Sequence, residues 1–162
     1  MDKKALLDTL CAVFYRDGDD NLANLVEMCA ADSHSVELSI DGEPCAWAFW
    51  ERKGQNTHDF EPSTYGKYIN YNTKKTKEMM SDDDIYLSLI AVSPKHQGKG
   101  IGKDIVELVY RQSGCAGSIY LWADKTCNST FYERIGFEKA GEFDSPYLGA
   151  TSIFRKPTKR GV

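Results

Sequence analysis

The feature of this 162-residue chain that most constrains its fold is an apolar segment followed by a glycine-rich turn and an amphipathic pattern. "IYLSLIAV" at 85–92 is apolar enough to predict a buried strand. "KHQGKGIGKD" at 95–104 then places three glycines at alternate positions, flanked by lysines. The segment after the turn repeats apolar residues at helical spacing, at Ile101, Ile105, Leu108 and Val109. Strand, turn and helix in this order predict a unit of an α/β fold.

The rest of the chain predicts further strands and helices around that unit. Two amphipathic segments, "DKKALLDTLCAVFYR" and "NLANLVEMCA", predict helices joined by a turn at "RDGDD". "VELSI" and "CAWAFWER" predict strands that "DGEP" joins in a hairpin. "SIYLWA", "FEKAGEF" and "TSIFRK" predict more strands, and "NSTFYERIG" predicts a short helix ending at Gly136. We therefore expect an α/β (α+β) fold, with a mixed central sheet of about six to seven strands and flanking helices, in one domain over 1–162.

Composition argues against several classes of function. The net charge of −4 and the pI near 5.4 disfavour a general nucleic-acid-binding protein. No apolar run approaches the roughly 20 residues of a membrane helix, and the charged start "MDKKALLDTL" is unlike a signal peptide. The three histidines lack metal-ligand spacing, so we expect no metal. The five cysteines form no C-x-x-C pair, which favours reduced thiols in a cytoplasmic protein.

Glycine-rich turns before helices often bind phosphate groups, and three phosphate motifs compete for the turn after Pro94. A Walker loop requires glycine where the chain has Gln97, and serine or threonine where it has Asp104. A Rossmann fingerprint requires a third glycine where the chain has Lys103, and it belongs in the first strand–helix turn of its unit. Both motifs therefore fail.

The third motif fits. Residues 97–102, "QGKGIG", match the pattern Q/R-x-x-G-x-G/A, and "NSTFYERIGF" at 128–137 resembles N-x-x-x-x-Y-x-x-x-G-F. Both patterns are similar to those of the GNAT acetyltransferase superfamily, and the resemblance extends over positions 84–140. It implies the GNAT acyl-CoA N-acyltransferase fold with a splayed pair of central strands, acetyl-CoA as the acetyl donor, and transfer to an amine.

The resemblance also implies roles for individual residues. Backbone groups of Ile90, Ala91 and Val92 would pair with the pantetheine arm of acetyl-CoA. Tyr132 would give a proton to the departing thiolate, or would be only a core aromatic. Asn128 would be a helix N-cap or a contact of the pantetheine arm. The pyrophosphate would bind the turn and the start of the next helix, at Gln97, Gly98, Lys99, Gly100, Ile101, Gly102 and Lys103.

The chain departs from the family pattern at Ser88, where many members carry a glutamate that acts as general base. Asp84, Glu51 and His58 stay open as groups that could act through water, as does an amine that arrives partly deprotonated. The insertion at 60–80, which predicts a helix, resembles the layout of puromycin-acetyltransferase-like members. Its four aromatic residues either line an acceptor pocket or pack on the sheet: Phe60, Tyr65, Tyr68 and Tyr71.

Together these inferences predict a cytoplasmic N-acetyltransferase that moves the acetyl group of acetyl-CoA directly to a primary amine of a small molecule. We expect a monomer or homodimer that binds neither nucleic acid nor membrane. Two alternatives stay open: a non-catalytic acyl-CoA-binding sensor or partner module, which the loss of glutamate at Ser88 favours, and a protein or peptide N-acetyltransferase. A covalent mechanism through Cys115 or Cys127 lacks a recognisable histidine partner.

Overall fold

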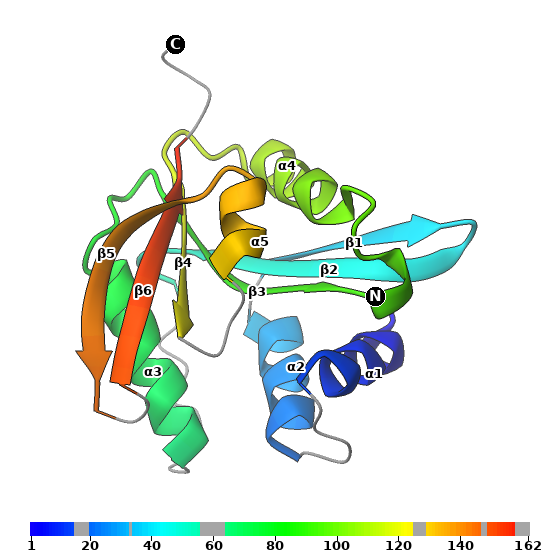
Figure 1. Cartoon of the computed structure of the whole chain (residues 1–162), viewed down its shortest axis with the longest axis horizontal. Helices are drawn as coiled ribbons and strands as arrows, with labels where there is room; N and C mark the ends of the chain where they lie inside the picture. The colour runs from blue at the N-terminus through cyan, green and yellow to red at the C-terminus, as the bar shows by residue number, and fades with distance from the viewer. Residues whose placement is uncertain (15–19, 33, 56–63, 125–128, 147–148, 158–162) are drawn as a thin grey trace. The chain divides into compact units, whose positions relative to one another are not determined.

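The structure is a computed structural model of the chain, and it describes residues 1–14, 20–32, 34–55, 64–124, 129–146 and 149–157. The helices and strands expected from the sequence are present, and the turn expected at "RDGDD" lies outside these residues. The elements (Figure 1) follow in the order α1 (Lys3–Phe14), α2 (Asp20–Asp32), β1 (His34–Ile40), β2 (Glu43–Arg52), α3 (Thr64–Lys77), β3 (Ile85–Val92), η1 (Pro94–His96), α4 (Ile101–Ser113), β4 (Ile119–Asp124), α5 (Ser129–Arg134), β5 (Glu138–Ser145) and β6 (Gly149–Lys156).

The strands hydrogen-bond in the order β1-β2-β3-β4-β6-β5, which confirms the expected mixed sheet. β3 runs parallel to β4, and their paired residues are Ile85 with Ile119 and Tyr86 with Tyr120. The pairs β1–β2, β4–β6 and β5–β6 are antiparallel.

The hairpin between β1 and β2 has the turn that its sequence predicts. Ile40 pairs with Glu43, so Asp41 and Gly42 form a two-residue connection. Their φ angles are 52° and 78°, and positive φ at both positions defines the turn that suits the twist of a hairpin. Asp-Gly is a preferred sequence for this turn because glycine adopts positive φ without strain.

The chain divides into two compact units, and the first contains residues 1–50 and 88–114. In this unit α1 packs against α2, and both lie on one face of the β1–β2 hairpin, while α4 lies on the other face (Figure 1). The apolar positions of each helix face inward. Buried side chains include Leu6, Leu10, Val26, Ile105 and Val109.

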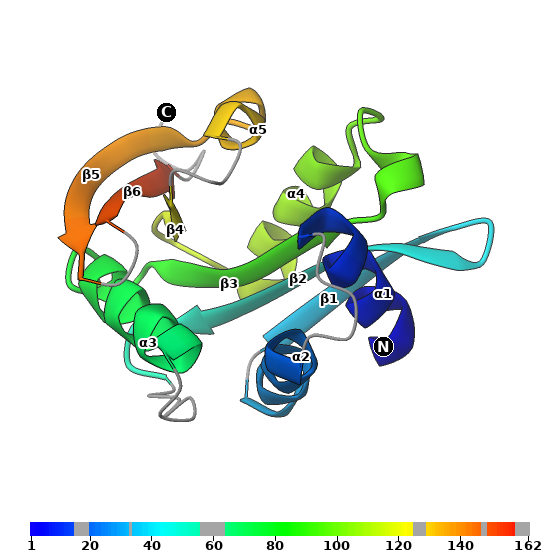
Figure 2. The same ribbon diagram turned by 60° about the horizontal axis from the view of Figure 1, so that its bottom comes forward.

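The second unit contains residues 51–87 and 115–162. Here α3 lies along β4 and β5 (Figure 2). Ile153 of β6 is buried in a cluster with Met80, just after α3, whereas the ring of the next residue, Phe154, packs against Tyr132 of α5. Successive side chains of a strand point to opposite faces, so α3 and α5 cover opposite faces of these strands. β2 and β3 contribute residues to both units, and a single domain over 1–162 stays a prediction.

Within the part of the chain that the structure describes, no helix is long and apolar enough to cross a membrane. The same residues contain no group of three His, Cys, Asp or Glu side chains that could hold a metal ion.

Candidate functional site

The glycine turn connects the end of β3 to the start of α4. The Nε2 of Gln97 donates a hydrogen bond of 3.1 Å to the carbonyl oxygen of Val92, which ties the exposed turn to the strand. Gly98 and Gly100 have φ angles of 79° and 80°, a left-handed conformation that glycine adopts without strain. A Cβ atom built at either glycine would meet no atom within 4 Å. The turn therefore presents backbone to an open space.

The start of α4 faces the same turn. N–H groups of the first helical turn have no partner within a helix, and the N-cap residue Gly100 has no side chain to accept from them. Together with the positive end of the helix dipole, these N–H groups at Ile101, Gly102 and Lys103 form a site suited to an anion.

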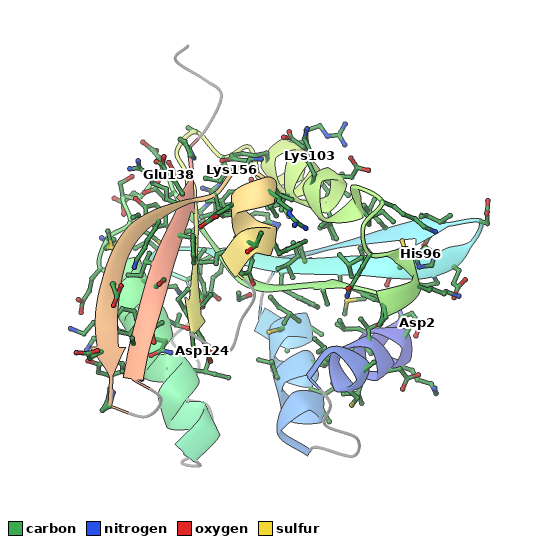
Figure 3. The ribbon with its side chains drawn as sticks, in the orientation of Figure 1. Asp2, His96, Lys103, Asp124, Glu138 and Lys156 are labelled. Carbon is green, nitrogen blue, oxygen red and sulfur yellow. The ribbon has the colours of Figure 1, made fainter. Side chains whose placement is uncertain are left out.

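Two exposed lysines add positive charge around the turn. Lys99 lies within it, and Lys103 lies in the first turn of α4 (Figure 3). Neither forms an ion pair with another described residue. Asp104 is the one acidic residue in the first turn of α4. The local chemistry suits an anion.

β3 carries the residues expected to bind the pantetheine arm. Ile90 is half-buried, whereas Ala91 and Val92 are buried. One backbone group of this segment already has a partner, because the carbonyl of Val92 accepts from Gln97. At the next residue, the N–H of Ser93 donates to the carbonyl of Cys45 at 2.8 Å. The end of β3 is thus held in place from both the turn and β2.

Ser88 stands where many family members carry the general base, and Asp84 is one of the candidates to replace it. Both side chains have structural partners. The hydroxyl of Ser88 donates to the carbonyl oxygen of Phe49 at 3.1 Å. The buried carboxylate of Asp84 accepts hydrogen bonds from the N–H and hydroxyl of Ser81, at 2.7 and 3.1 Å, and from the N–H of Ser118, at 2.7 Å. Asp84 therefore fixes two loops.

Glu51, another candidate base, also has a structural partner. Its side chain is 1% exposed and forms an ion pair with Lys77 of α3. The same ammonium donates to the carbonyl of Gln55 at 2.8 Å and lies 5.6 Å from the ring centroid of Tyr86. Glu51 thus anchors the C-terminal end of α3. The third candidate, His58, lies outside the described residues.

Tyr132 is half-buried in α5, within a group of aromatic rings. Its ring centroid lies 5.3 Å from that of Phe131, 6.0 Å from Phe137 and 5.7 Å from Phe154. The ring therefore packs among these three rings, and its role in proton transfer stays a prediction. Asn128 lies outside the described residues.

Sequence reasoning missed a buried polar side of α3. Asn72 and Thr76 have no exposed surface. The hydroxyl of Thr73 forms a hydrogen bond of 2.9 Å with the Tyr86 hydroxyl and accepts one of 3.4 Å from the Trp122 Nε1. Polar residues in an insertion carry no sequence signal of burial, because only the tertiary fold brings β3 and β4 against this helix.

Of the four aromatic residues in the insertion at 60–80, only Tyr71 has a described side chain that tests whether these residues pack on the sheet. Tyr71 is half-buried, and its ring centroid lies 6.0 Å from that of Phe143 on β5, so it packs on the sheet. Phe60 lies outside the described residues, as do the side chains of Tyr65 and Tyr68.

Buried thiols are poorly suited to covalent catalysis in this chain. Burial raises the pKa of Cys45 and that of Cys115, and the nearby Asp84 carboxylate raises the pKa of Cys115 further. A higher pKa lowers the fraction of reactive thiolate at neutral pH. Cys127 lies outside the described residues.

Comparison with protein families gives the same assignment as the glycine turn. The model of the GNAT acetyltransferase domain matches residues 66–139, a segment that includes β3, the glycine turn and α4. Residues 66–139 are a GNAT acetyltransferase domain by this match. This family makes the chain an acetyltransferase-type enzyme, although no curated protein sequence matches it.

Solved structures share the fold of this GNAT protein at low identity. A putative GNAT acetyltransferase of Desulfovibrio desulfuricans is 21% identical, with a TM-score of 0.62 over 97% of this chain and 94% of that chain. An aminoglycoside 6′-N-acetyltransferase complexed with coenzyme A is 15% identical, with a TM-score of 0.63 over 96% and 89%. The ribosomal-protein-S18-alanine N-acetyltransferase of Escherichia coli is 15% identical, with a TM-score of 0.51 over 85% and 81%. The names of the last two refer to different acceptor classes.

Proposed function

We propose that this protein transfers the acetyl group of acetyl-CoA directly to the primary amine of a small molecule. The observation that carries the proposal is the turn with two left-handed glycines, which opens onto free space at the N-terminus of α4. A side chain at either glycine would hold a phosphate away from the backbone. A similar structure that contains coenzyme A supports the same choice of donor.

The pyrophosphate of acetyl-CoA binds the backbone from Gly98 to Lys103 in this proposal, with the ammonium groups of Lys99 and Lys103 at its rim. Gln97 contributes by holding the turn on Val92, as its hydrogen bond supports. Backbone groups at Ile90, Ala91 and Val92 orient the pantetheine arm and polarise the thioester carbonyl. Asn128 stays a candidate contact of that arm.

The reaction is a direct displacement. The lone pair of the amine attacks the thioester carbonyl carbon, the carbon–sulfur bond breaks, and an amide forms. The Tyr132 hydroxyl gives a proton to the departing thiolate, and the proton that the acceptor nitrogen loses passes through solvent to the Tyr132 phenolate and restores its hydroxyl. Since Ser88 donates to a backbone carbonyl and both Asp84 and Glu51 have structural partners, we assign none of them as general base. We propose that the amine arrives in its deprotonated form, with His58 as the alternative base acting through water.

The choice of a small-molecule acceptor rests on α3. This helix packs against β4 and β5, whereas a peptide acceptor would need an open groove for extended backbone. A small amine is better held in an enclosed site with aromatic walls.

Release of coenzyme A from acetyl-CoA across a panel of amines tests the function. The panel contains aryl amines, polyamines, aminoglycosides and peptides with free N-termini or lysines. We expect amine-dependent release with a small molecule and isolation of its acetamide. A clear preference for peptides would overturn the acceptor class, and binding of acetyl-CoA without release to any amine would support the sensor instead.

A further inference from the structure

The helix α5 carries Tyr132 and depends on the rest of the chain for its position. It comprises only six residues, Ser129–Arg134, whereas isolated helices shorter than about 12–15 residues are marginal in water. The rings of Phe137 and Phe154 supply part of the support, with centroids 6.0 and 5.7 Å from that of Tyr132. These contacts hold the side chain, and a different contact holds the backbone at the end of the helix.

Lys156 of β6 makes that second contact. Its Nζ donates a hydrogen bond of 2.7 Å to the carbonyl oxygen of Ile135, the first residue after α5. Lys156 is 7% exposed and Ile135 is 9% exposed, so the bond is shielded from water. The last carbonyls of a helix lack partners within it, and a lysine side chain can supply one. The bond therefore ties the C-terminal end of α5 to the end of β6, where Figure 3 shows Lys156.

The turn after α5 admits the lysine side chain and holds Tyr132. Gly136 has a φ of 98°, and a Cβ atom built on it would lie 3.1 Å from the Lys156 Nζ. Glycine thus adopts the left-handed conformation and leaves room for the lysine. The Tyr132 carbonyl accepts from the N–H of Ile135 at 3.2 Å and from that of Phe137 at 3.0 Å. One set of contacts runs from Lys156 through this turn to Tyr132.

Packing alone does not account for a lysine at this position. Phe154 and Lys156 lie two residues apart on β6, so their side chains project from the same face. Phe154 contacts the Tyr132 ring there. Burying an ammonium group beside it costs free energy, which an apolar residue would not.

We propose that Lys156 is a positioning residue for Tyr132: it holds the turn after α5 so that the phenol hydroxyl meets the departing thiolate. This inference rests on the proposed function. Proton transfer requires hydrogen-bond distance, and a displacement of about 1 Å can cost about 10²-fold in rate. Loss of the lysine contact should therefore lower kcat without weakening coenzyme A binding.

Lys156→Met keeps the apolar length of the side chain and removes the donor. We expect kcat to fall at least about tenfold, with the amine of the panel that wild type uses best, while calorimetry gives a coenzyme A affinity within about twofold of wild type. Lys53→Met is the matched control and should leave kcat unchanged. Lys53 also donates to a backbone carbonyl at 2.7 Å in the same unit, but its partner is Met80.

A double-mutant cycle separates positioning from a general structural role. In a Tyr132→Phe background, Lys156→Met should change kcat by less than about twofold, because the hydroxyl that it positions is absent. Gly136→Ala is the second variant. Its methyl group should displace the lysine without removing the buried charge, so it should lower kcat with the same dependence on the Tyr132 hydroxyl.

Unchanged kcat in either variant, equal falls with and without the Tyr132 hydroxyl, or loss of coenzyme A binding by Lys156→Met would overturn the role of Lys156. A loss below threefold in Tyr132→Phe itself would do the same. These results leave the proposed transfer standing. If wild-type protein releases no coenzyme A with any amine of the panel, the proposed function fails, and the role of Lys156 fails with it.

Discussion

Gly100 and Gly114 occupy the two ends of α4 in the same left-handed conformation, with φ angles of 80° and 61°. A Cβ atom at either would meet no atom within 4 Å. Replacing each with alanine therefore introduces a similar backbone strain, of about 1 kcal/mol. We expect only Gly100→Ala to weaken coenzyme A binding, at least about tenfold by calorimetry, because its methyl group would occupy open space at the proposed pyrophosphate site.

Gly114→Ala is the matched control for strain and for helix stability. Equal affinities of the two variants for coenzyme A, with equal unfolding temperatures, would contradict the assignment of the turn as the pyrophosphate site. Loss of affinity in both would point to a general effect on α4.

The role of the Tyr132 hydroxyl can be tested separately from the packing of its ring. Tyr132→Phe keeps the contacts with Phe131, Phe137 and Phe154 and removes only the proton donor. If the hydroxyl protonates the departing thiolate, kcat should fall by about 10²–10⁴-fold, with the affinity for acetyl-CoA nearly unchanged. Steady-state kinetics and calorimetry measure the two quantities. A loss of less than threefold in kcat would leave Tyr132 with packing alone.

Among the elements, α3 is held to its unit by a buried ion pair. The side chains of Lys77 and Glu51 are 12% and 1% exposed. Lys77→Met removes the ammonium from a buried carboxylate and should cost about 3 kcal/mol, which is a fall in Tm of roughly 6–12 °C for a chain of this size. Lys75→Met is the control, because Lys75 and its partner Glu78 are 41% and 55% exposed; this variant should change stability by less than about 1 kcal/mol.

Thermal or urea unfolding measures both variants. The double variant Glu51→Gln with Lys77→Met should recover part of the loss, because it no longer buries a charge beside an apolar side chain. Similar unfolding temperatures for Lys77→Met and Lys75→Met would show that the ion pair does not anchor α3.

The elements predicted best from the sequence are those whose sequence signals lie within a short stretch of the chain. An apolar run, alternating glycines and a helical repeat specify β3, the turn and α4 from short stretches of chain. The Asp41–Gly42 turn is equally local. In α4 the apolar repeat predicted the burial of Ile105 and Val109 but not that of Val106, which is also buried. The buried face of the helix is wider than the row of residues that the repeat defines.

The sheet-facing side of α3 could not be predicted in this way. Asn72 and Thr76 are fully buried although both are polar, and Glu51 is buried at the end of a strand. Their burial results from contacts between segments far apart in the chain. The same holds for Asp84, whose partner Ser118 lies 34 residues away. Sequence therefore indicated the donor turn, while the residues around α3 required tertiary structure.

At the scale of the whole molecule, direct transfer requires that acetyl-CoA and amine occupy the protein together. Intact protein incubated with acetyl-CoA alone should therefore gain no acetyl group by mass spectrometry, and initial rates should give intersecting double-reciprocal lines. The raised pKa values of Cys45 and Cys115 reduce their thiolate fraction at neutral pH, which argues against an acetyl-thioester on either. Raising the pH increases that fraction, so any acetylated cysteine should form faster at high pH. Acetylated protein at pH 7 together with parallel lines would establish a covalent intermediate and overturn direct transfer.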